Sequence, residues 1–74
     1  MRRFEDAYHD KLAWLEDKLG TGYTTVPMVA QYILHVDAAT LRADPTLPVV
    51  FFGSRRRVPI DSLARWLVDK EYKH

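Results

Sequence analysis

The chain has 74 residues, of which 47% are apolar and 28% charged, and its net charge is +1. This length suits one domain spanning residues 1–74, and the apolar content excludes a disordered chain. Cysteine is absent, which excludes disulfides and thiolate metal sites, and no apolar run is long enough for a transmembrane helix or a signal peptide. We therefore expect a soluble protein of the cytoplasm.

Residues 3–19 predict an amphipathic helix. Apolar side chains recur there at spacings of three and four, and Gly20 follows where a left-handed cap would end the helix. The opposite face is rich in carboxylates and should face water. The apolar face either packs on the core or binds a partner or a second copy. It consists of Phe4, Ala7, Tyr8, Leu12, Trp14, Leu15 and Leu19.

Two short helices are predicted between residues 24 and 43. Thr24 and Thr25 precede Val26-Pro27, which is typical of a capped helix start, and the first helix runs over residues 28–34. Asp37 is a second cap, and residues 38–43 form the next helix before a proline ends it. Because so few residues join them, the helices must cross steeply, as in a helix-turn-helix. The apolar face that they share would be Val29, Ala30, Ile33, Val36 and Leu41.

A β-hairpin is predicted over residues 48–60, with Gly53-Ser54 as a two-residue turn between β-prone runs. Strand alternation puts Arg55 and Arg57 on one face and Arg56 on the other. Two guanidinium groups on an exposed edge suit phosphate contacts, and they equally suit an edge strand that avoids aggregation. A closing helix then covers residues 62–72, with Asp61 as its cap. Its apolar stripe would be Ile60, Leu63, Trp66 and Leu67.

These elements predict a mainly α fold with a small β-hairpin: a winged helix-turn-helix over residues 24–67 with an extra N-terminal helix. The same segment resembles the excisionase-like, MerR-type winged helix-turn-helix domains of bacteria and their mobile elements. The residues that carry the resemblance are Thr25-Val26, Val29-Ala30, Val36-Asp37, Thr40-Leu41, Leu47-Pro48, Val50, Gly53, Arg55, Arg57-Val58-Pro59, Leu63 and Trp66-Leu67.

The resemblance implies binding of double-stranded DNA, as an excisionase or a small transcriptional regulator encoded by a bacterium or phage. An integrase or a second copy of the chain would be a further partner. In such domains the first turn of the second helix approaches the bases and the hairpin approaches phosphates. Asp37 is interpreted as a cap, with a cytosine contact as the alternative. The expected DNA-binding residues are Ala38, Ala39, Thr40, Arg42, Gly53, Ser54, Arg55 and Arg57.

The chain departs from the family pattern at four places. Ala38 and Ala39 stand where basic or polar side chains are common. Leu34-His35 stands where the family usually keeps one residue, Arg56 replaces an inward aromatic, and Phe51 replaces a basic residue. An exposed Phe51 would be costly, so we expect the apolar face of the N-terminal helix to cover it. Arg56 is expected to lay its aliphatic stem on the core.

A protein-interaction module, such as a phage or mobile-element adaptor, is the second hypothesis, because the net charge is low and the second helix has few donors. Exposure of Phe51, Phe52 and Trp14 would favour it. An enzyme is not expected. His9, His35 and His74 are isolated, and the paired carboxylates of the first helix have no nucleophile or phosphate loop beside them. We therefore assign no catalytic residue, metal, cofactor or small-molecule substrate.

Overall fold

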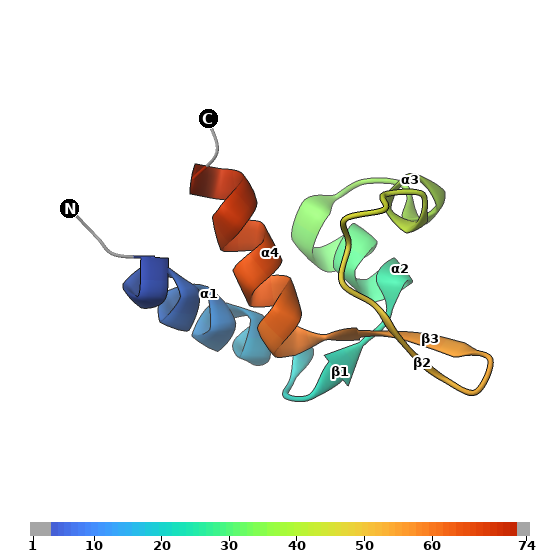
Figure 1. Ribbon diagram of the computed structural model, residues 1–74, viewed down its shortest axis with the longest axis horizontal. Coiled ribbons are helices and arrows are strands. Elements are labelled where there is room, and N and C mark those ends of the chain that lie inside the picture. The colour runs from blue at the N-terminus through green and yellow to red at the C-terminus, as the bar shows by residue number, and fades with distance from the viewer. Residues whose placement is uncertain (1–3, 73–74) are drawn as a thin grey trace.

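The computed structural model describes residues 4–72. It is mainly helical, with a small three-stranded antiparallel sheet, as Figure 1 shows. The order along the chain is α1 (Phe4–Leu19), β1 (Tyr23–Thr24), α2 (Val26–Val29), a π-helical turn η1 (Ala30–Leu34), α3 (Ala38–Arg42), β2 (Val50–Phe52), β3 (Arg55–Pro59) and α4 (Ile60–Tyr72).

Helices α1 and α4 pack side by side and form one half of the molecule (Figure 1). Leu15 is fully buried at this contact, and Lys11 Nζ lies 2.7 Å from a carboxylate oxygen of Glu71. As predicted, α1 ends at Gly20, whose φ is 87° and whose amide donates to the carbonyl of Glu16 at 2.9 Å. The predicted start of this helix at residue 3 lies outside the described residues.

Trp14 does not belong to the packed face of α1, contrary to the sequence-based expectation. Its side chain is 40% exposed, and the ammonium groups of Lys11 and Lys18 lie 5.1 and 5.2 Å from its ring centroid. The reason is angular: Trp14 and Leu15 are adjacent in sequence and so about 100° apart around a helix with 3.6 residues per turn. Of these two residues, Leu15 is the one that faces α4 and the core.

The sheet has the order β1-β3-β2. The hairpin turn at Gly53-Ser54 is confirmed, with φ of 66° at Gly53 and Phe52 opposite Arg55. Strand β1, which the sequence analysis did not predict, pairs with the far end of β3, so that Thr24 lies opposite Val58. Both of these side chains are buried and face the core. Arg55 and Arg57 therefore lie on the other, outer face, as predicted.

Thr25 is the N-cap of helix α2, as predicted, and Thr25 Oγ1 accepts a hydrogen bond from the amide of Met28 at 3.4 Å. The helix begins at Val26, two residues before the predicted start at residue 28. The helix then widens into η1 and ends at His35, which has the left-handed φ of 54°. A π-turn accommodates one residue more than an α-turn. The chain therefore leaves η1 through a wide turn that ends at His35.

This turn changes the predicted helix-turn-helix core. The amide of Val36 donates back to the carbonyl of Ala30 at 3.0 Å, and the Val36 side chain is 43% exposed instead of buried. Ile33 is only half-buried. The core that does form lies among α1, α2–η1, α3, α4 and the inner face of the sheet. It consists of Leu15, Val26, Val29, Ala30, Leu41, Leu47, Val58, Ile60, Leu63, Ala64 and Leu67.

Both predicted aspartate caps differ from expectation in detail. Asp37 occupies the N-cap position of α3, but its side chain makes no capping hydrogen bond. Helix α4 begins at Ile60, so Asp61 lies within its first turn, where Asp61 Oδ1 accepts from the amide of Ser62 at 2.8 Å. The amide of Ile60 instead donates to the carbonyl of Gly22 at 2.8 Å, which joins α4 to the segment between α1 and β1.

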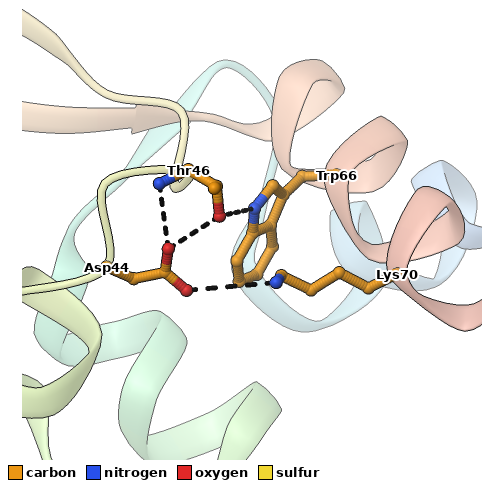
Figure 2. Close-up of polar contacts among 4 residues, drawn as sticks. All are labelled: Asp44, Thr46, Trp66 and Lys70. Atoms are coloured by element: carbon orange, nitrogen blue, oxygen red, sulfur yellow. Dashed lines mark hydrogen bonds and ion pairs between the residues drawn. The ribbon is translucent and has the colours of Figure 1, made fainter. Parts of the chain in front are cut away.

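A polar cluster ties the segment after α3 to α4 (Figure 2). Asp44 Oδ1 accepts from the Thr46 amide at 2.9 Å and from the Thr46 hydroxyl at 2.7 Å. The Thr46 hydroxyl in turn accepts from the Trp66 indole N–H at 3.0 Å, while Lys70 Nζ lies 4.0 Å from Asp44 Oδ2 and 4.8 Å from the Trp66 ring centroid. This cluster holds the chain in place where it leaves α3 for the hairpin.

The pKa of Asp44 lies below its usual value of 3.8, chiefly because the Thr46 hydroxyl and then the Thr46 amide donate to the carboxylate; Lys70 adds a smaller effect. Folding therefore favours the charged carboxylate, and the resulting stability is complete above pH 3.8 and is lost as the pH falls through the lowered pKa.

Thr46→Val should move the pKa of Asp44 up toward 3.8 in a carboxyl NMR titration, and the control Thr21→Val should not. An unchanged Asp44 pKa in Thr46→Val would show that the hydroxyl bond is not formed.

Candidate nucleic-acid interface

Three arginines from two separate elements meet at one open depression. Arg42 comes from the end of α3, whereas Arg56 and Arg57 come from the middle of β3. The chain leads from β1 into α2 along the same side, so that Thr25, Val26 and Pro27 complete the lining. We call this surface the arginine depression; it consists of Thr25, Val26, Pro27, Arg42, Arg56 and Arg57.

The arginines of this depression are held by weak local contacts. Arg57 Nη1 donates to the backbone carbonyl of Arg56 at 2.8 Å, and the Arg56 guanidinium lies 5.5 Å from the centroid of the Phe51 ring. Arg56 and Arg57 are half-buried, and Arg42 is exposed. None of the lining residues is acidic, and among residues 4–72 no ion pair joins these guanidinium groups to a carboxylate. The depression therefore presents concentrated positive charge to solvent.

The predicted DNA-binding residues fall into three groups. Arg42 and Arg57 are brought together in the arginine depression. Gly53, Ser54 and Arg55 lie at the exposed tip of the hairpin, with Arg55 on the outer face. The remaining residues, on the first turn of α3, are Ala38, Ala39 and Thr40.

Ala39 and Thr40 are exposed on α3, whereas Ala38 is half-buried and packs against the core. Ala38 also lines a second open depression with His35 and Asp37. Pro27 belongs to this depression and to the arginine depression, so the two are neighbours. The start of α3 and the arginines thus lie on adjoining surfaces.

Sequence reasoning missed two parts of the arginine depression: Arg56 and the segment Thr25–Pro27. Arg56 was left out of the predicted site because strand alternation places it on the inner face with Val58, where its aliphatic stem was expected to lie on the core and its charged end to extend outward. The hairpin projects from the rest of the molecule (Figure 1), however, so Arg56 stays partly exposed and its guanidinium lies 5.5 Å from the centroid of the Phe51 ring. The signal that the sequence offered for this was the exposed turn at Gly53-Ser54, which already implied a projecting hairpin tip.

A metal site has no support among residues 4–72, where no three histidine, aspartate or glutamate side chains gather as such a site would require. His9 and His35 are exposed, and His74 lies outside the described residues. The same part of the chain contains no helix that is both long and apolar enough to cross a membrane.

Neither a family model, nor a curated protein, nor a solved structure matches this chain. The chemistry of the interface therefore rests on the described residues alone. Three guanidinium groups in a depression with no acidic lining residue, next to an exposed short helix and an exposed hairpin tip, suit a polyanion with regularly spaced phosphates.

Proposed function

We propose that this chain binds double-stranded DNA as a winged helix-turn-helix, acting as an excisionase or a small transcriptional regulator in the cytoplasm of a bacterium. A single observation carries the proposal: Arg42 of α3 and the two β3 arginines line the same depression, and none of its lining residues is acidic. A helix and a hairpin that share one basic surface can straddle a groove and its flanking phosphates. An integrase or a second copy would bind beside it on the DNA.

Each part of this surface has a role in the proposed complex. The exposed Ala39 and Thr40 approach the bases of the major groove, where their methyl groups suit thymine. Arg42 reaches a guanine edge or a phosphate. The hairpin tip lies along the backbone, with the amides of Gly53 and Ser54 and the side chain of Arg55 near a phosphate. Ala38, half-buried against the core, positions the helix more than it reads the bases.

A second candidate function, a protein-interaction module, is favoured by the exposure of three large side chains. Phe51, Phe52 and Trp14 are 59%, 55% and 40% exposed. Helix α1 packs on α4 and leaves Phe51 uncovered, so the expected cover of Phe51 by α1 is wrong. The three do not form one patch, because Trp14 lies between Lys11 and Lys18 on α1 while the phenylalanines lie on the hairpin.

Arg42→Ala tests the DNA proposal directly. If Arg42 contacts a base edge, we expect the preferred duplex to lose about 1–3 kcal/mol of binding free energy while other sequences lose less. Fluorescence anisotropy with a selected duplex and its scrambled counterpart measures both losses. Arg65→Ala is the matched control, because Arg65 is an exposed α4 arginine that lies over the Tyr8 ring, outside the depression.

A simpler measurement, binding of duplex DNA at low salt, distinguishes the two candidate functions. A DNA-binding protein of this charge pattern must bind duplex DNA at low salt, where the attraction between phosphates and arginines is least screened. Absence of binding to random and to genomic duplexes at low salt would contradict the DNA proposal and leave the interaction module in its place.

A further inference from the structure

The outer face of the sheet carries two exposed aromatic rings side by side. Tyr23 on β1 is 54% exposed and Phe52 on β2 is 55% exposed. Their ring centroids are 5.2 Å apart with an interplanar angle of 86°, an edge-to-face pair. They lie on opposite sides of β3, the central strand, and therefore span the outer face. Large aromatic surfaces in this position are available for contact with a ligand.

Positive charge surrounds this aromatic pair at its hairpin end. Arg55 lies directly opposite Phe52, and Arg57 lies opposite Val50 on the same face. The three strands together carry three arginines and no carboxylate. The carboxylates of Glu16 and Asp61 lie at the other end, where they line an open depression with Tyr23. The outer face therefore favours an anion at the hairpin end and disfavours one beside β1.

We propose that this outer face binds single-stranded nucleic acid, with unpaired bases stacked on Tyr23 and Phe52 and the adjoining phosphates held by Arg55 at the hairpin end. Exposed aromatic rings combined with basic side chains on a sheet are suited to unstacked bases, because every base has a flat face that can stack on a ring. In a duplex these base faces are already covered by neighbouring base pairs. The site therefore differs from the duplex interface in its ligand and in its aromatic residues, while Arg55 is shared by both, and it goes beyond the proposed function.

The arrangement favours nucleic acid over a protein ligand for this face. An aromatic surface that binds protein is usually surrounded by a mixed polar rim. Here the charged groups on the hairpin half of the face are all guanidinium groups, which complements phosphate charge. The single strand can be DNA or RNA, since stacking and phosphate contacts do not require or exclude a 2′-hydroxyl.

Binding of an oligo-dT containing one 2-aminopurine tests the proposal, with an oligo-U of equal length to distinguish RNA from DNA. Stacking on the full chain should quench the 2-aminopurine fluorescence. Phe52→Ala and Tyr23→Ala should each weaken binding by about 5- to 160-fold, the range expected for loss of one stacked base. Tyr23→Phe should bind as the original does, because the ring is kept. Tyr32→Ala removes a similarly exposed tyrosine from η1 and should have no effect.

The result also separates this site from the duplex interface. Phe52→Ala should leave duplex binding unchanged, and Arg42→Ala should leave oligo-dT binding unchanged, because Arg42 lies in the arginine depression and not on the outer face. Circular dichroism of each variant shows whether it is folded. Equal oligonucleotide affinity of the original chain and a folded Phe52→Ala would overturn the proposal, as would unquenched 2-aminopurine at saturating concentrations of the original chain.

Discussion

Leu15→Ala should lower the free energy of unfolding by about 2–5 kcal/mol, whereas Trp14→Ala at the neighbouring position should lower it by less than about 1 kcal/mol. Leu15 has no exposed surface and belongs to the core shared by α1 and α4. Its truncation removes buried apolar area and leaves a cavity. Trp14 has the larger side chain, but it is 40% exposed and does not belong to the core. The contacts described for its ring are with the ammonium groups of Lys11 and Lys18.

Urea denaturation followed by circular dichroism measures both free energies without depending on tryptophan fluorescence, which one of the variants changes. The two variants form a matched pair, because both replace a large apolar side chain with alanine in the same turn of the same helix. If Trp14→Ala costs as much as Leu15→Ala, Trp14 is buried in solution and the observed packing of α1 on α4 is incorrect.

The sequence predicted best those features that local chemistry determines. Gly20 ends α1 because a residue without Cβ adopts positive φ at little cost. Gly53 fits the first position of the two-residue turn for the same reason, and Thr25 before Val26-Pro27 produces the observed cap. Each of these features depends on one to four consecutive residues. No distant part of the chain has to be known to predict them.

The errors occurred where tertiary packing decides. Periodicity showed that α1 has an apolar face but not that α4 covers only its Leu15 side, so Trp14 was wrongly assigned to that face. The π-turn η1 depends on how α2 and α3 meet, and it is this turn that moves Val36 to the surface. Strand β1 exists only because β3 offers an edge to pair with. A two-residue strand has no pattern of its own.

The candidate site was predictable in its residue types but not in its geometry. Arg42 and Arg57 are 15 positions apart, and nothing in the sequence required their side chains to line one surface. The arginines of α3 and β3 line one surface together with the segment Thr25–Pro27, which completes the lining of the depression. Arg56 lines the depression because the hairpin projects from the rest of the molecule (Figure 1). Strand alternation predicts which face a side chain lies on, but not how far the hairpin projects.

Replacing Arg55 and Arg57 together with alanine should flatten the slope of log affinity against log salt for duplex DNA by about 1.8, because each phosphate that an arginine neutralises adds about 0.9 to the slope. The affinity should fall nearly equally for all sequences, because phosphate contacts position the protein without reading bases. This is the largest expected effect on DNA binding. Arg55 is exposed at the hairpin tip and Arg57 lies at the arginine depression, and neither pairs with a carboxylate among the described residues.

The matched control is the double variant Lys18→Ala with Arg65→Ala, which removes the same charge from exposed positions on α1 and α4. If only net charge matters, both double variants should flatten the slope equally. If the hairpin holds phosphates, the control should leave the slope nearly unchanged, because the charges it removes lie far from the DNA and are screened by salt. Anisotropy titrations between about 50 and 200 mM salt give the slopes, since phosphate contacts change affinity by decades across that range. An unchanged slope in the Arg55 and Arg57 variant would exclude the hairpin from the DNA interface.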